Sequence, residues 1–228
     1  MPTALITGAS RGFGLALARS LVADGWSLVL DARGADDLHE AVRGLGDGSG
    51  VVALPGDVTD PKHRVALVER AGARIDLLVN NASTLGPSPR PPLATFPIDE
   101  LERVYAVNVL APLALIQLAV PQMAPGAVIV NVTSDAAREP YPGWGGYGSA
   151  KAALEQMTAI LGAEHPELRV FAFDPGDMRT RMHQEAFPGE DISDRPPPED
   201  SVPALLALLA GSEPSGRYRA QELTVVWG

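Results

Sequence analysis

The sequence alternates short apolar runs with longer stretches of helical spacing, and this alternation limits the possible folds more than any other feature. The apolar runs are rich in β-branched residues and are separated by turn residues, a pattern typical of buried parallel strands. Candidate strands span residues 4–7, 27–31, 51–54, 75–80, 127–132, 169–173 and 222–227, and candidate helices span 13–24, 35–44, 61–72, 98–120, 147–163 and 200–210. The order predicts an α/β fold, a Rossmann-type doubly wound sheet of about seven parallel strands with helices on both faces.

The length of the chain bounds its organisation. A chain of 228 residues can bury one large core, so we expect residues 1–228 to form a single domain. Residues 85–97 contain five prolines and predict an extended loop before the helix that follows. Residues 175–200 are rich in proline and acidic groups, and a weakly periodic segment of this length is typical of a substrate lid or a disordered segment.

Composition excludes several kinds of site. The chain has no cysteine, so disulfides, thiolate metal sites and a cysteine nucleophile are excluded. Its 18 basic and 28 acidic side chains give a net charge of −10, which argues against nucleic acid or an anionic membrane surface as a partner. No metal site is predicted, because the histidines lack ligand spacing; they are His39, His63, His165 and His183.

The N-terminal residues and the hydropathy pattern predict a cytoplasmic protein. Residues 1–7 lack the charged start and the long apolar stretch of a signal peptide. No apolar run reaches the roughly 20 residues that a membrane helix needs. We therefore expect a cytoplasmic location and no membrane partner.

A glycine-rich loop, residues 7–14, lies between the first predicted strand and the first predicted helix. Gly8, Gly12 and Gly14 permit a tight turn, close approach of the backbone to a pyrophosphate, and close packing of helix on strand. The helix N-terminus then points free N–H groups at the anion. The alternative is a glycine-rich turn with no ligand. The spacing lacks the Gly-Lys-Ser/Thr ending of a P-loop, which disfavours a nucleoside triphosphatase.

Tyr147 and Lys151 lie four residues apart at the start of a predicted helix, which places the phenol and the ammonium on one helix face. A cation at this distance favours the tyrosinate, so we expect a lowered pKa for Tyr147 and a role as general acid toward a carbonyl oxygen. The alternative is a solvated surface pair, which is common at this spacing. Lysine is scarce in this chain, the other being Lys62, and this scarcity favours the catalytic interpretation.

Ser134 ends an apolar predicted strand. Ligands of doubly wound sheets bind beyond the carboxyl ends of the strands, so Ser134 is placed to donate a hydrogen bond to a substrate carbonyl. The alternative is an ordinary cap or turn serine.

In combination these motifs resemble the short-chain dehydrogenases/reductases in their short, single-domain form. The resemblance covers about residues 3–227, and its motifs occur in order: Thr7-Gly-x-x-x-Gly-x-Gly14, Asp57-Val58, Asn80-Asn81-Ala82, Asn108, Ser134, Tyr147-x-x-x-Lys151 and Pro175-Gly176. The resemblance implies that Tyr147 is the acid/base and that Ser134 polarises the carbonyl. It implies that Lys151 holds the nicotinamide ribose and tunes the tyrosine, and that Asn108 supports a water that relays protons to the lysine.

The resemblance also implies a cofactor site and a substrate pocket. The residues implied to bind the cofactor are Gly8, Ser10, Arg11, Gly12, Phe13, Gly14, Arg33, Asp57, Val58, Asn81, Ala82, Tyr147, Lys151, Pro175, Gly176, Met178 and Thr180. The residues implied to line the substrate pocket are Leu85, Asp135, Ala136, Ala137, Trp144, Met178 and the segment 177–200.

Two positions depart from the family pattern. Ser83 stands where the family usually has glycine, and Phe13 where a small aliphatic residue is common; we expect both to act mainly through the backbone. Near the implied relay residue, Pro112 cannot donate to the carbonyl of Asn108, four residues earlier, and its ring crowds that group. This carbonyl is therefore predicted to be free for a water, and a proline kink with no function is the alternative.

The residues after the second predicted strand bear on the choice of cofactor. In the favoured register, Ala32 takes the place of an acid that binds the adenosine ribose, and Arg33 follows it. Arg11 in the glycine loop offers a second cation, and bidentate arginine–phosphate contacts favour NADP(H) over NAD(H). A slip of one residue would instead place Asp31 at the ribose and favour NAD(H).

These features predict an NADP(H)-dependent oxidoreductase that interconverts a carbonyl and an alcohol of a small-molecule substrate by hydride transfer. The alternative is a catalytically silent nucleotide-binding sensor or scaffold on the same fold. A third alternative, a different Rossmann-type enzyme such as a methyltransferase, would have no use for the pair formed by Tyr147 and Lys151. The resemblance also implies pairing through the predicted helices 98–120 and 147–163, so we expect a homodimer or homotetramer.

Overall fold

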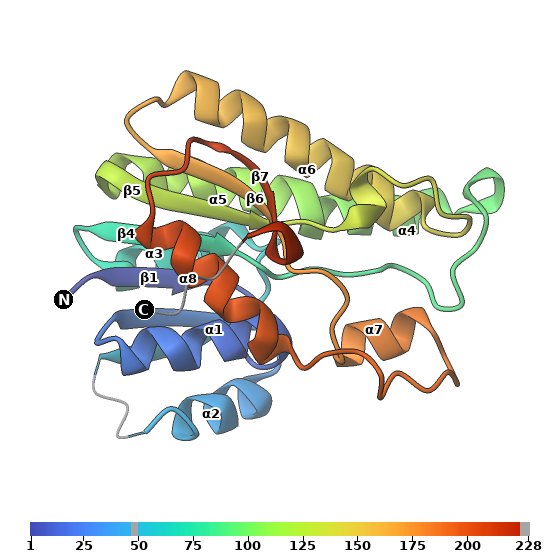
Figure 1. Ribbon diagram of the computed structural model, residues 1–228, viewed down its shortest axis with the longest axis horizontal. Coiled ribbons are helices and arrows are strands. Elements are labelled where there is room, and N and C mark those ends of the chain that lie inside the picture. The colour runs from blue at the N-terminus through green and yellow to red at the C-terminus, as the bar shows by residue number, and fades with distance from the viewer. Residues whose placement is uncertain (47–49, 224–228) are drawn as a thin grey trace.

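The computed structural model describes residues 1–46 and 50–223, and its centre is a parallel sheet (Figure 1). Seven strands pair in the order β3-β2-β1-β4-β5-β6-β7, and every neighbouring pair is parallel. The strands are β1 Thr3–Ile6, β2 Ser27–Ala32, β3 Val51–Pro55, β4 Ile75–Asn80, β5 Met123–Val132, β6 Arg169–Asp174 and β7 Gly216–Arg219. The strand order reverses between β1 and β4, which confirms the predicted doubly wound parallel sheet.

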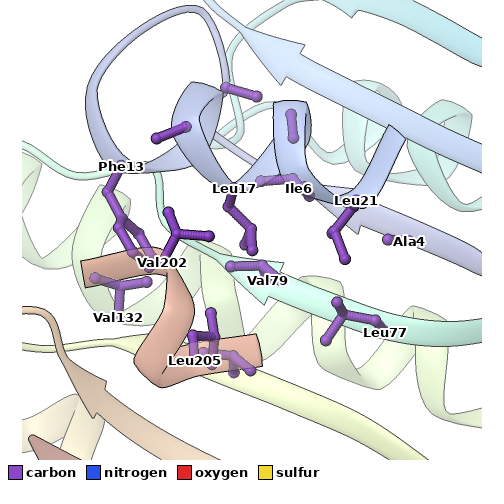
Figure 2. Packing of buried hydrophobic residues seen from close by; sticks show 14 of the residues in the cluster. Ala4, Ile6, Phe13, Leu17, Leu21, Leu77, Val79, Val132, Val202 and Leu205 are labelled. Carbon is purple, nitrogen blue, oxygen red and sulfur yellow. The ribbon is translucent and has the colours of Figure 1, made fainter. Parts of the chain in front are cut away.

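Helices cover both faces of this sheet (Figure 1). They are α1 Gly12–Ala23, α2 Ala35–Arg43, α3 Pro61–Ala71, α4 Ile98–Tyr105, α5 Ala111–Ala119, α6 Gly145–Glu164, α7 Arg181–Ala186 and α8 Val202–Ala210. Along β1, Ile6 joins a core with α1 and α8, whereas its neighbour Leu5 joins a core with α3 and α5. Figure 2 shows Leu17 of α1, Val79 of β4 and Leu205 of α8 turned toward the first of these cores. Successive strand residues point to opposite faces, and both faces are buried, so the strands read as continuous apolar runs.

The seventh strand does not lie where the sequence predicts it. β7 ends at Arg219 and a 3-10 turn follows over Ala220–Glu222, while residues 224–227 of the predicted strand lie outside the described residues. The four residues of β7 carry little apolar signal. Ion pairs support the strand instead, because Arg217 Nη2 lies 2.8 Å from Asp174 Oδ2 and Arg217 Nε lies 2.7 Å from Glu155 Oε1. The prediction of a strand at 222–223 is therefore wrong. Ion pairs between distant residues leave no periodic pattern in the sequence, so the pattern did not indicate β7.

The long predicted helix 98–120 is widened at its centre. A π-helical turn, Ala106–Leu110, joins α4 to α5, and the N–H of Ala111 donates to the carbonyl of Ala106, five residues back. Pro112 follows at once; it has no N–H, and in a regular α-helix its ring would crowd the carbonyl of Asn108. The wide turn accommodates this proline, so its effect is a local widening rather than a simple kink.

The stretch Ile98–Gln122 is a described helix that length and composition would allow to cross a membrane. The sequence prediction did not single it out, although residues 104–122 contain no charged side chain. Its inner face is part of a core, however, since Leu115, Ile116 and Ala119 pack with the sheet and α3. A buried core helix passes the same test of length and composition. The absence of a membrane partner therefore stays a prediction.

Residues 175–200, the predicted lid, contain α7 and a 3-10 turn at Pro198–Ser201. The hydroxyl of Thr180 accepts a hydrogen bond from the N–H of His183 at 3.2 Å and caps the N-terminus of α7. The segment also closes on itself, because the N–H of Arg179 donates to the carbonyl of Pro196 at 2.8 Å. Figure 1 shows α7 beyond the carboxyl ends of the strands, where ligands of such sheets bind.

Candidate active site

A cavity of about 790 Å³ lies at the carboxyl ends of the strands and joins the glycine loop to Tyr147. It is lined by all the predicted catalytic and cofactor residues except Gly14 and Asn108. These lining residues are Gly8, Ser10, Arg11, Gly12, Phe13, Arg33, Asp57, Val58, Asn81, Ala82, Ser134, Tyr147, Lys151, Pro175, Gly176, Met178 and Thr180. Of the predicted substrate residues outside segment 177–200, Leu85, Asp135, Ala136 and Trp144 line the cavity and Ala137 does not.

The glycine loop is bound tightly to the end of β4. Gly8 has a φ of +66°, a left-handed conformation, and a Cβ there would lie 2.8 Å from the Cα of Ala82. The side-chain amide of Asn81 donates to the carbonyls of Thr7 and Gly8 at 3.0 and 2.9 Å. Gly14 lies outside the cavity because it is the packing glycine: a Cβ there would meet Asn81 Nδ2 at 2.5 Å. No side chain caps the N-terminus of α1, so its first N–H groups face the loop without a side-chain partner.

Phe13 was expected to act mainly through its backbone, but its side chain also has a structural role. Its ring is buried and stacks on Phe173, with ring centroids 5.7 Å apart, in the core beneath α1. The large side chain therefore fills space between α1 and β6 as well as bordering the cavity.

The end of β2 brings Asp31, Ala32 and Arg33 to the cavity, and the carboxylate of Asp31 is engaged by a buried partner. Asp31 lies on the face of the sheet that α3 covers, and its Oδ1 is 2.6 Å from His63 Nε2. Burial raises the pKa of Asp31 to about 6, against the hydrogen bond and charge of His63. This carboxylate therefore has a hydrogen-bond partner inside the protein, as a buried carboxylate requires.

Two exposed guanidinium groups, those of Arg11 and Arg33, line the cavity near the glycine loop and the end of β2. Arg11 makes only a loose contact with Asp37, at 3.6 Å between exposed groups. Arg33 lies near Asp57: although burial opposes the shift, hydrogen bonds from Thr59 and the charge of Arg33 lower the pKa of Asp57. Exposed contacts of this kind are weak, so both guanidinium groups remain able to bind a phosphate.

Tyr147 and Lys151 are buried together on the first turns of α6, so the pair is not a solvated surface pair. The Lys151 ammonium donates to the carbonyl of Val132 at 2.7 Å and lies 5.5 Å from the centroid of the Tyr147 ring. Burial lowers the pKa of Lys151 to about 8. Since an ammonium has three donors, this lysine retains hydrogen-bonding capacity for a ligand in the cavity.

The predicted lowering of the Tyr147 pKa is wrong in the cofactor-free protein. Burial of the phenol and the nearby carboxylate of Asp174 raise the pKa of Tyr147. The nearby hydroxyls of Ser134 and Ser83 lower the pKa of the phenol, but they do not outweigh burial. The prediction failed because it counted the charge of the lysine and not the desolvation of the phenol. The neutral phenol is the form that donates a proton.

Ser134 stands at the end of β5, where the sequence predicts it. Its hydroxyl donates to Asp135 Oδ1 at 2.9 Å and accepts from the N–H of Ala136 at 3.2 Å, so it also caps a 3-10 turn. The cap interpretation and the catalytic one are thus compatible, since Ser134 lines the same cavity as Tyr147 and lowers the pKa of its phenol.

Asn108 is fully buried behind the reaction centre rather than lining the cavity. Its Oδ1 accepts from the Ser83 hydroxyl at 3.1 Å and from the N–H of Thr84 at 2.9 Å, and its Nδ2 donates to the carbonyl of Thr84 at 2.9 Å. The expectation that Ser83 acts mainly through its backbone is therefore wrong. The two residues are 25 positions apart, and no local pattern reports such a contact.

The far end of the cavity is walled by a cluster that the sequence analysis found only in part. The guanidinium of Arg90 lies 4.0 Å from the ring centroid of Trp144 and 5.1 Å from that of Phe187, and it donates to the carbonyl of Ala186 at the end of α7. Ser88 reinforces this contact by donating to the carbonyl of Glu185 at 2.9 Å. A lone cation in a proline-rich loop was the one available signal for Arg90.

Among residues 1–46 and 50–223, no group of three or more histidine, aspartate or glutamate side chains is arranged to hold a metal ion.

Comparison with known proteins gives one consistent family. The family model described as short chain dehydrogenase matches residues 2–191. Sepiapterin reductase of Bos taurus is 34% identical over 203 residues, which cover 80% of this chain and 74% of that protein. A short chain dehydrogenase of Shigella flexneri 2a complexed with NADP has a TM-score of 0.89 at 27% identity, and the match covers 96% of this chain and 97% of that one.

A more distant source gives the same fold. The alcohol dehydrogenase of the archaeon Thermococcus sibiricus, complexed with 5-hydroxy-NADP, has a TM-score of 0.83 at 27% identity, and the match covers 96% of this chain and 95% of that one. The matching family model, these relatives and the geometry of the cavity agree: the chain belongs to the short-chain dehydrogenase/reductase family.

Proposed function

We propose that this protein is an NADP(H)-dependent oxidoreductase that interconverts a carbonyl and an alcohol of a small-molecule substrate. One observation carries the proposal: the buried phenol of Tyr147 and the hydroxyl of Ser134 lie in the same cavity as a glycine loop and an uncapped helix N-terminus. A proton donor and a phosphate site that share one cavity suit the reduction of a carbonyl by a dinucleotide.

In the reductive direction, Tyr147 donates its phenolic proton to the carbonyl oxygen while the hydroxyl of Ser134 donates a hydrogen bond to the same oxygen. The raised pKa of Tyr147 keeps the phenol protonated at neutral pH, as a proton donor requires. When bound, NADPH supplies the hydride that reduces the carbonyl carbon. In the oxidative direction, the alcohol proton passes to Tyr147, which must first be a phenolate.

The preference for NADP(H) rests on charge at the end of β2. Arg33 and Arg11 are exposed and line the cavity, and the carboxylate of Asp31 is hydrogen-bonded to His63. A phosphate on the adenosine ribose would meet two guanidinium groups there. The structural neighbours crystallised with NADP and 5-hydroxy-NADP support the same cofactor.

The chemical class of the reaction has independent support. Sepiapterin reductase and an alcohol dehydrogenase are among the similar proteins; the first name describes a reduction and the second the oxidation of an alcohol. The wall formed by Trp144, Phe187 and Leu85 is apolar, so the carbonyl is expected to be attached to an apolar or ring-containing group.

The test uses purified protein, NADPH and a panel of ketones, aldehydes and quinones, read by NADPH absorbance. At least one compound is expected to be reduced, and Tyr147→Phe is expected to abolish turnover while NADPH binding, followed by fluorescence, stays nearly unchanged. Turnover that survives this substitution would contradict the assigned role of Tyr147. Binding of NADPH without turnover on the whole panel would favour a silent nucleotide sensor instead.

We also propose that the protein is a cytoplasmic homodimer or homotetramer paired through the stretch 98–120 and α6. Leu110 and Ile160 are large apolar side chains on these helices that are about half exposed, at 56% and 47%. Light scattering after size exclusion tests the oligomer, and a monomer at micromolar concentration would contradict it.

A further inference from the structure

Ser83 connects the reaction centre to a buried amide. It follows the Asn-Asn-Ala motif after β4 and borders the cavity. Its hydroxyl donates to Asn108 Oδ1 at 3.1 Å and lies close enough to the phenol of Tyr147 to lower the pKa of that group. One hydroxyl group therefore lies between the proposed proton donor and a side chain that is fully buried.

The buried amide does not depend on this hydroxyl. Asn108 Oδ1 also accepts from the N–H of Thr84 at 2.9 Å, and Asn108 Nδ2 has its own acceptor in the carbonyl of Thr84. A buried acceptor that keeps one good donor is not left unsatisfied when a second donor leaves. The single hydrogen of Ser83 is therefore free to rotate toward another acceptor.

The phenol of Tyr147 becomes such an acceptor during the reaction. While Tyr147 is protonated, its own O–H is the donor, and the hydrogen of Ser83 rests on Asn108. Once the proton has passed to the substrate, the phenolate oxygen is a stronger acceptor than an amide oxygen, because hydrogen bonds to charged groups are roughly twice as strong. The nearby carboxylates of Asp174 and Asp135 disfavour this phenolate, so an added donor has a large effect.

We propose that Ser83 is a positioning residue that acts through Tyr147: its hydroxyl turns from Asn108 to the phenolate as Tyr147 loses its proton, and turns back when the proton returns. This proposal rests on the proposed oxidoreductase function. The O–H bond of Tyr147 breaks, its proton goes to the carbonyl oxygen, and the electron pair stays on the phenolate. Ser83 keeps its proton throughout and only exchanges one hydrogen-bond acceptor for another.

The kinetic test compares Ser83→Ala with the wild type over a range of pH, using a carbonyl and alcohol pair that the panel identifies. Ser83→Ala is expected to lower kcat about tenfold, because a hydrogen bond to a charged group is lost. It is also expected to move the rise in alcohol oxidation to higher pH, because the phenolate forms less readily. The Kd of NADPH should not change, and Ser83→Thr, which retains a hydroxyl, should restore both kcat and the pH profile.

Ser149→Ala is the matched control. Ser149 lies on the same helix as Tyr147, but its hydroxyl donates to the carbonyl of Gly146 at 3.2 Å and does not border the cavity. Its removal should leave the pH profile unchanged. Profiles of Ser83→Ala and the wild type that superimpose would overturn the proposal, as would a tenfold loss shared equally by Ser149→Ala.

A second measurement needs no turnover. Tyrosine labelled with ¹³C at Cζ reports phenolate formation by NMR in the NADP⁺ complex, and Tyr147→Phe assigns the resonance. The pKa of Tyr147 should be higher in Ser83→Ala than in the wild type, and an equal or lower pKa would overturn the proposal. Lack of turnover on the whole panel would contradict the oxidoreductase function instead, so the two failures are distinguishable.

Discussion

The two ends of the cavity are built in different ways. The cofactor end is formed by backbone at the carboxyl ends of β1 and β4, where Gly8 is left-handed and Asn81 binds two loop carbonyls. The substrate end is formed by side chains of three separate segments, where Arg90 lies on Trp144 and Phe187. The first arrangement has no room for an added atom. The second depends on contacts between loops, which a substitution weakens without disturbing the sheet.

Gly8→Ala is expected to have the largest effect, because it adds an atom to the backbone-built cofactor end. The new methyl group would require a left-handed alanine and would lie 2.8 Å from the Cα of Ala82, so we expect a loss of about 3 kcal/mol in the free energy of unfolding. The affinity for NADPH should fall by more than about a hundredfold, because the loop can no longer approach the phosphate. Urea unfolding and fluorescence titration measure the two effects.

Gly25→Ala is the control for Gly8→Ala. Gly25 also has a positive φ, +79°, but a Cβ there would meet no heavy atom within 4 Å. It should cost only about 1 kcal/mol of stability and leave NADPH affinity unchanged. Equal losses of affinity in both variants would show that backbone strain, and not crowding at the cofactor loop, sets the effect.

Within the cofactor end, Arg33→Ala separates charge from backbone. If Arg33 binds the ribose phosphate, its loss should weaken NADPH binding about 10- to 100-fold and leave NADH binding nearly unchanged. The control is Arg43→Ala, which removes an exposed guanidinium from the end of α2. Equal losses for NADPH and NADH would show that the register at the end of β2 is wrong.

At the substrate end, Arg90→Ala should act on the substrate and not on the cofactor. The guanidinium packs on two aromatic rings and donates to the end of α7, a contact worth roughly 1 kcal/mol. We expect KM for the carbonyl to rise about five- to tenfold and hydrogen exchange in α7 to quicken, with the Kd of NADPH unchanged. Arg90→Lys retains the charge without the planar stacking and should show part of the effect. A change confined to NADPH binding would contradict the assignment of this cluster to the substrate end.

The same contrast explains what the sequence could predict. The glycine loop, Tyr147 with Lys151, and Ser134 are each recognised within a few consecutive residues, and the buried strands leave apolar runs. Contacts between polar side chains far apart in the chain leave no such record. The partner of Asp31 is His63, on the next helix but one, and Arg217 of β7 is held by Asp174.

The pKa of Tyr147 shows a further limit of sequence reasoning. The charge of Lys151 is visible in the spacing, but the desolvation of the phenol depends on every segment packed around it. The contact of Ser83 with Asn108 was also missed, because the π-helical turn that carries Asn108 meets the residues after β4 only in the folded chain. Residue types at a site are thus more predictable than the ionisation of the groups they place there.

The smallest expected effect is that of Asp31→Asn. This variant tests whether cofactor binding depends on a carboxylate at the end of β2. Its pKa in the folded protein, about 6, lies above its ordinary value of 3.8, so protonation of Asp31 favours the folded state. This contribution is present below pH 4 and is lost as the pH rises through about 6. Asp31→Asn cannot ionise but can still hydrogen-bond to His63, so the free energy of unfolding should lose this decrease, roughly 1 to 2 kcal/mol between pH 4 and 7. We expect the ratio of NADPH to NADH affinity to stay the same, because the carboxylate is already hydrogen-bonded to His63. A ratio that shifts toward NADPH in Asp31→Asn would mean that the carboxylate of Asp31 reaches the ribose. The cofactor end would then depend on a side chain of β2 as well as on backbone, and would be less different from the substrate end.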